Sequence, residues 1–113
     1  MKIIILLFTS FYTLQSNAYS EDISTHLGKE KVETICSVCH GMDGQAGSAG
    51  NSALIPNLTA QNKLYLIEKL NAYKSGKLEH HQMGIIAQML SKEDIENISD
   101  WYSRIEIVIK SKF

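Results

Sequence analysis

The chain has 113 residues, of which 44% are hydrophobic and 20% charged, and its formal net charge is −1 at pH 7. This length allows one domain, and the ordinary globular composition argues against a disordered chain. The balanced charge, without a long run of one sign, excludes a dedicated nucleic-acid binder, which needs a clustered basic surface.

The N-terminal residues have the pattern of an export signal. Lys2 supplies a positive start, an apolar run extends from Ile3 to Leu14, and Ser16-Asn17-Ala18 offers small residues for cleavage. The run is about half to two-thirds of the roughly 20 residues that cross a bilayer. We predict a signal peptide over residues 1–18, a folded domain over residues 19–113 and a periplasmic location. An uncleaved anchor at the outer face of the membrane is the alternative, and both readings place the fold outside the cytoplasm.

The first helix is expected from about Thr25 to Val38, with apolar residues on one stripe and charges elsewhere. The stretch Gly41 to Asn51 has four glycines in eleven residues and predicts a loop. Pro56, the only proline, lies in the same irregular region.

A second helix is expected from about Gln61 to Ser75, because apolar residues recur every three positions. Gly76 suits the left-handed stop after the last turn. The stretch from Gly76 to Leu90 is predicted to be a second loop.

The last helix has the clearest start. Ser91 followed by Asp94 forms a serine cap with an acid three positions on. The expected buried face contains Ile95, Ile98, Trp101, Tyr102 and Ile105. The alternating stretch Ile105 to Ile109 is predicted to continue this helix. The pattern as a whole predicts an all-α fold.

The chemistry of the chain lies at Cys36-Ser37-Val38-Cys39-His40. A C-x-x-C-H string is the attachment signature of c-type haem. Two thiols one helical turn apart can add to the two vinyl groups on one edge of a porphyrin. His40 is then placed so that a ring nitrogen meets the iron from one side.

Three other interpretations of the cysteine pair have less support. A thioredoxin-like redox pair needs a βαβ frame, and no strands are predicted around it. A zinc site needs four ligands, whereas the chain has two cysteines and four histidines without a second pair at finger spacing. A structural disulfide is possible in an exported protein but explains nothing else in the pattern.

Several motifs together make the chain resemble a small single-haem class I cytochrome c, of the bacterial type similar to one half of the di-haem periplasmic cytochromes. The resemblance covers residues 25–109 and is carried by CSVCHG with Asp43-Gly44, IPNL with Gln61, Tyr65, Leu70, Tyr73, Gly76 and the run from Met83 to Ile95. It implies N- and C-terminal helices that cross, with helices and loops wrapped around one covalent haem. Gly28 matches the small residue at that crossing, and Ile98 and Trp101 match positions on its other side.

The resemblance implies Met83 as the second axial ligand. A soft thioether suits haem iron, and Met83 lies 43 residues after His40 in a predicted loop. Met42 is too close to His40 to reach the opposite face, and Met89 is expected to pack in the core. His80 and His81, expected at solvated loop positions, are the competing ligands.

Other residues have weaker roles. The resemblance implies that the carbonyl of Pro56 accepts a hydrogen bond from His40, which tunes the ligand. Tyr65, Tyr73 and Trp101 either pack in the core or line the haem. The lysines at 63, 69, 74 and 77 are expected to form a solvated face, with steering of a partner as the alternative.

A haem with both axial positions filled by protein has no vacant site for a substrate, so we expect an electron carrier and not an enzyme. Its partners would be redox proteins of a respiratory chain, met transiently by a monomer. One alternative is a haem c subunit of a periplasmic oxidoreductase complex, for example with a flavoprotein or a sulfur-compound dehydrogenase. Another is a ligand-binding or sensor haem from which Met83 dissociates.

Overall fold

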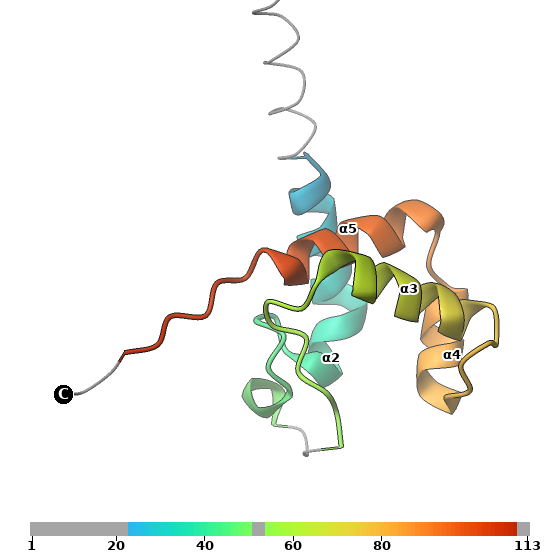
Figure 1. Ribbon diagram of the computed structural model, residues 1–113, viewed down its shortest axis with the longest axis horizontal. Helices are drawn as coiled ribbons and strands as arrows, with labels where there is room; N and C mark the ends of the chain where they lie inside the picture. The colour runs from blue at the N-terminus through green and yellow to red at the C-terminus, as the bar shows by residue number, and fades with distance from the viewer. Residues whose placement is uncertain (1–22, 51–53, 111–113) are drawn as a thin grey trace, which may run out of the picture.

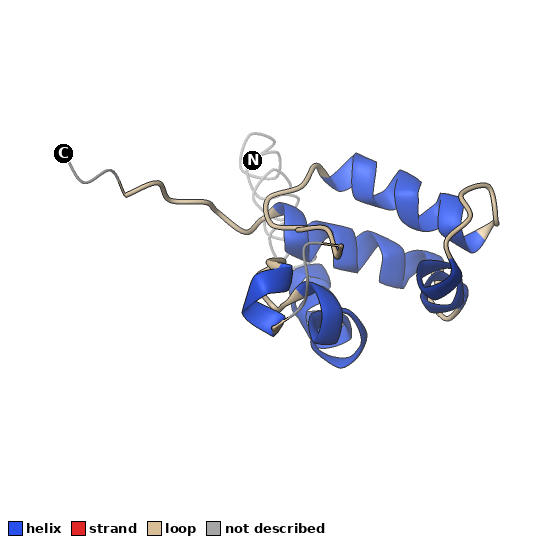
Figure 2. Cartoon of the chain, turned by 90° about the horizontal axis from the view of Figure 1, so that it is seen from below, coloured by secondary structure: helices blue, strands red, loops and turns tan. Residues whose placement is uncertain are grey.

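The computed structural model describes residues 23–50 and 54–110, and all regular elements within those residues are helices (Figures 1 and 2). The all-α prediction is therefore confirmed for this part of the chain. The predicted signal peptide, residues 1–18, lies outside the described residues. Among the described helices, none combines the length and apolar character that a membrane span requires.

The first helical segment begins within the described residues at 23 and continues to His40. It contains an α-helical stretch over 23–31, the π-helix η1 (Val32–Cys36) and the short helix α2 (Ser37–His40). The predicted helix is confirmed and extends further at its C-terminal end. The wider π-helical turn ends at Cys36, the first residue of the cysteine motif, and such turns are frequent at functional sites.

Helix α3 (Lys63–Lys74) is the predicted second helix. The side chain of Asn62 accepts a hydrogen bond from the backbone N–H of Tyr65 (3.1 Å) and caps its start. Gly76 has φ +74°, so the left-handed stop is confirmed.

The predicted loop from Gly76 to Leu90 is wrong in its second half, because it contains helix α4 (His81–Gln88). The sequence gives a weak helix signal here, since Gly84 lies in the middle and the segment is short. A helix of two turns is unstable alone and depends on tertiary packing. Here α4 packs against α3, and Ala87 is completely buried.

Helix α5 (Lys92–Ser103) begins with the predicted cap. Ser91 Oγ accepts from the N–H of Asp94 (3.0 Å), and the Asp94 carboxylate accepts from the N–H of Ser91 (2.8 Å). The predicted continuation over Ile105 to Ile109 is wrong, because the helix ends at Ser103 and the chain becomes extended. Ile107, Val108 and Ile109 are 65%, 73% and 88% exposed. These β-branched side chains are poor helix formers and have no neighbouring core there.

The core joins the first helical segment to α3, to α5 and to Leu90 in the short connection between α4 and α5. Figure 1 shows α3 and α5 side by side, with α2 and α4 apart from one another below them, near opposite ends of α3. The predicted buried face is confirmed for the residues within α5, with Trp101 only partly buried. Ile105 packs against the same cluster from beyond the end of the helix. The fully packed residues are Val32, Leu66, Leu90, Ile95, Ile98 and Tyr102.

The first helical segment crosses α5 at Gly28, as the resemblance implies. A β-carbon at position 28 would lie 2.2 Å from the carbonyl oxygen of Asn97 and 3.3 Å from Cβ of Trp101, so only glycine fits. Two polar contacts flank the crossing. Thr25 donates to Asp100 (3.2 Å), and Lys31 pairs with Asp94 (3.1 Å).

Asp100 joins three segments of the fold. Its buried carboxylate accepts hydrogen bonds from Lys63, the first residue of α3 (2.6 Å), and from Arg104, just after α5 (2.6 Å). The same carboxylate accepts the hydrogen bond from Thr25. Burial opposes ionisation of this group, but the hydrogen bonds from Arg104 and Lys63 outweigh it and hold the pKa of Asp100 below its usual range. Asp100 therefore stays charged near neutral pH and ties α3 to the crossing.

We predict that Gly28→Ala destabilises the protein by about 1–3 kcal/mol, because the added methyl group forces the two helices apart. The matched control is Gly47→Ala, since a β-carbon at position 47 meets no atom within 4 Å. Denaturant unfolding followed by circular dichroism measures both free energies. Equal stabilities of the two variants would contradict the close crossing.

Candidate functional site

The two cysteines lie one helical turn apart at the junction of η1 and α2. Cys36 is the last residue of η1, and Cys39 lies within α2. Both are in the described part of the chain, and no disulfide joins them. Burial raises the pKa of the Cys36 thiol to about 12, with the charge of Lys31 opposing the rise. The Cys39 side chain is exposed, so the pair has one thiol on the inside and one at the surface.

His40 is buried and has a defined ring orientation. Its Nδ1 lies 2.9 Å from the carbonyl oxygen of Pro56. A carbonyl oxygen only accepts hydrogen bonds, so Nδ1 carries the proton and donates it. The lone pair is then on Nε2, which is the arrangement found in metal-binding histidines whose other nitrogen is bound to a carbonyl group.

Backbone hydrogen bonds hold the Pro56 segment beside the loop that follows His40. The carbonyl oxygen of Gly44 accepts from the N–H of Leu58 (2.6 Å) and of Thr59 (3.3 Å). Gly44 has φ +74°, and a β-carbon there would lie 2.5 Å from the backbone nitrogen of Thr59. Glycine at position 44 is therefore required for the approach of these two segments.

The C-terminal end of α5 holds the same loop from the other side. The Tyr102 hydroxyl donates to the carbonyl oxygen of Gly41 (3.0 Å), and the Trp101 indole donates to that of Met42 (3.2 Å). The carbonyl oxygen of Tyr102 accepts from the N–H of Ala60 (3.0 Å). Burial raises the pKa of Tyr102, which remains a neutral donor.

The sequence pattern predicts both aromatic residues on an apolar face but does not predict these hydrogen bonds. The available signal was the polar tip of each ring, since buried tyrosine and tryptophan usually find a partner for it.

The structure brings Cys36, Cys39, His40 and Pro56 together, whereas Met83 lies on a separate element. Met83 is a half-buried residue of α4. Helix α4 lies near the opposite end of α3 from α2 (Figure 1). Met83 is therefore in a helix and not in the loop that the sequence predicted. The expected core packing of Met89 is wrong, because that side chain is 64% exposed. Ala87 near the end of α4 and Leu90 after it are both buried, whereas Met89 between them is turned outward.

Val38, two residues before His40, is 72% exposed, and Leu54, two residues before Pro56, is 92% exposed. Residues two apart on a helix do not face each other, so Val38 does not share the helix face of His40. The donor set itself, with one half-buried thiol, one exposed thiol and an oriented imidazole, suits a porphyrin held by two thiols and one histidine.

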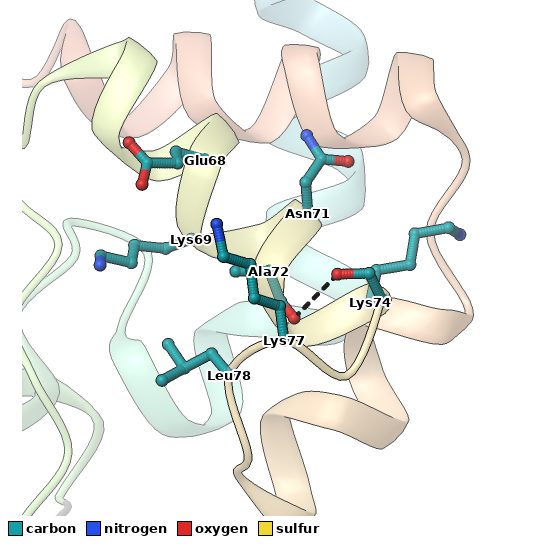
Figure 3. Close-up of a pocket in the computed structure, with 8 residues that line it drawn as sticks. Glu68, Lys69, Asn71, Ala72, Lys74, Lys77 and Leu78 are labelled. Atoms are coloured by element: carbon teal, nitrogen blue, oxygen red, sulfur yellow. Dashed lines mark hydrogen bonds between the residues drawn. The ribbon is translucent and has the colours of Figure 1, made fainter.

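The surface of α3 has a hollow of about 810 Å³ that involves none of these residues (Figure 3). It is lined by Glu68, Lys69, Asn71, Ala72, Lys74, Ser75, Lys77 and Leu78.

Three of the four lysines that were predicted to form a solvated face make specific contacts with other residues. Lys63 pairs with Asp100, and Lys69 lies 5.2 Å from the ring centre of Tyr65. Lys74 donates to carbonyl oxygens at and just after the C-terminal end of α4. Tyr65 is exposed and does not pack in the core.

His80 and His81 are both exposed, as expected. His80 precedes α4 and caps it, while His81 is the first residue of the helix. Within the described ranges, no group of three or more His, Cys, Asp or Glu side chains is arranged to hold a metal ion.

Comparison with known proteins gives two matches. The model of the cytochrome c family matches residues 26–103. Over 82 residues the chain is 39% identical to cytochrome c-554(548) of Halomonas halodenitrificans, a stretch that covers 70% of this chain and 93% of that protein. The family match includes the cysteine motif and ends where α5 ends, so the exposed C-terminal segment lies beyond it.

Proposed function

The chain belongs to the cytochrome c family, whose members bind covalent haem c and transfer electrons, and from this we propose that it is a periplasmic one-electron carrier with a single His/Met-ligated haem. Cys36 and Cys39 form the two thioether bonds. His40 and Met83 would ligate the iron, and Pro56 would orient His40.

The observation that carries the proposal is the hydrogen bond between His40 and Pro56. It fixes the imidazole with Nδ1 protonated, so the lone pair lies on Nε2, where it would bind the haem iron. The same hydrogen bond makes the imidazole of His40 more basic, and therefore a stronger ligand for a metal. Tyr102 and Trp101 support it by holding the two residues after His40.

The position of α4 supports Met83 as the second ligand. Helices α2 and α4 lie apart below α3 and α5 (Figure 1), so residues from each can approach a bound group from different sides. When bound, the haem iron supplies a one-electron ferric–ferrous couple whose potential a methionine ligand raises. With both axial positions occupied by side chains, His40 and Met83 leave no coordination site for a substrate.

The N-terminal sequence supports the proposed periplasmic location. The N-terminal sequence has the pattern of a signal peptide. Covalent attachment keeps the cofactor on a protein that is outside the cytoplasm. Its partners are redox proteins, which a carrier meets through small, short-lived interfaces.

One observation favours a second candidate function, a haem c subunit of a periplasmic oxidoreductase complex. Ile107, Val108 and Ile109 form an exposed apolar segment beyond the family match. Permanent subunits bury such surfaces against a partner.

Recovery of the native protein distinguishes carrier from subunit. We expect a monomer that separates from all catalytic chains in high salt. Transient electron-transfer interfaces are small, and salt screens the charge interactions that hold them together. Size-exclusion chromatography of the native protein measures this. Co-elution with a catalytic chain that survives high salt would establish the subunit function instead.

For the ligand set, we predict that Met83→Ala abolishes the weak charge-transfer band of a methionine-ligated ferric haem. Imidazole should also bind the ferric variant at least tenfold more tightly, because it no longer competes with the Met83 sulfur for the iron. A competing bond worth about 1.4 kcal/mol already lowers the apparent affinity tenfold. The matched control is Met89→Ala, which should leave both properties unchanged. Loss of the band in the Met89 variant, with the band retained in the Met83 variant, would reverse the assignment.

A further inference from the structure

We propose that His80 is the positioning residue for Met83, because its side chain fixes the first turn of α4 at the amide of that residue. This inference rests on the proposed function, since it takes Met83 as the iron ligand. His80 has extended backbone geometry (φ −162°, ψ 115°) and immediately precedes the helix. Its Nδ1 accepts a hydrogen bond from the backbone N–H of Met83 (3.2 Å).

The bond has the geometry of a helix N-cap. The first amides of a helix have no partner within it, and a side chain that accepts from the third one stabilises the start. Met83 is the third residue of α4, so the capped amide belongs to the residue that carries the sulfur. For Nδ1 to accept this bond, the neutral imidazole of His80 must carry its proton on Nε2.

The last turn of α3 holds α4 at both ends. The rings of Tyr73 and His80 pack edge to face, with centres 5.8 Å apart and planes at 76°. The next residue, Lys74, donates to the carbonyl oxygens of Gln88 (3.5 Å), the last residue of α4, and of Leu90 just beyond it. A lysine at this end also interacts favourably with the helix dipole. Tyr73 therefore fixes where the capping ring lies, and the cap fixes where the helix begins.

The inference gives His80 a role distinct from that of a competing ligand. An eight-residue helix is unstable without such contacts, so loss of the cap increases the population in which its first turn is open. In that population the Met83 sulfur is displaced from the iron, and an added ligand competes more easily. Loss of an N-cap typically changes the equilibrium by about fivefold.

The test uses the ferric haem-loaded protein and imidazole as the competing ligand. We compare His80→Ala, which removes the acceptor, with His80→Asn, which restores a good N-cap. The matched control is His81→Ala, because His81 is the adjacent exposed histidine and does not cap. Imidazole affinity and the intensity of the methionine charge-transfer band are measured for each variant.

We expect His80→Ala to bind imidazole about fivefold more tightly than the wild type and to have a weaker band, because the cap no longer holds the Met83 turn. His80→Asn and His81→Ala should both stay within twofold of the wild type. The proposal is overturned by a change of less than twofold in His80→Ala, by an equal change in His81→Ala, or by a failure of asparagine to restore the wild-type affinity.

Met83→Ala in the same series separates this inference from the ligand assignment. If that variant loses the band while His80→Ala behaves as the wild type, Met83 is the ligand and only the role of His80 is wrong. If Met83→Ala retains the band, the ligand assignment itself is wrong, and the role of His80 is overturned with it.

Discussion

The hydrogen bond between His40 and Pro56 joins two segments that are sixteen residues apart and converts a flexible imidazole into a fixed one. The remaining contacts around the motif keep that bond in place. Gly44 allows the two segments to approach, because a β-carbon there would collide with the backbone of Thr59. Without this approach the Pro56 carbonyl would be out of reach, and the His40 ring could turn freely about its side-chain torsions.

Helix α5 connects the two ends of this arrangement. At its middle it touches Gly28 of the first helical segment, and at its C-terminal end Tyr102 holds the loop after His40. Asp100, between these points, binds Lys63 and so includes α3. The cysteine motif is therefore fixed by one helix that contacts the chain both before and after it. Met83 belongs to α4, whose position depends on α3, so the two proposed ligands are supported by different parts of the core.

Sequence patterns predicted those features of the fold that depend on residues close together in the sequence. The Ser91 cap needs only Asp94 three positions on, and it was identified correctly. Gly28 was placed by family resemblance, since no local pattern shows that Asn97 lies against it. Helix α4 was missed because its stability comes from packing on α3. The exposed segment at Ile107 to Ile109 was mistaken for helix because the period of apolar residues does not reveal that the core has ended.

Covalent attachment of haem at Cys36 and Cys39 is the central claim, and acid–acetone extraction measures it most directly. The protein should be matured in an oxidising compartment that has haem-attachment machinery. We expect the wild type to keep its haem on the polypeptide, Cys36→Ala and Cys39→Ala to hold it by at most one thioether bond, and the double variant to release it. Free extraction of haem from the wild type, or a colourless purified protein, would contradict the claim.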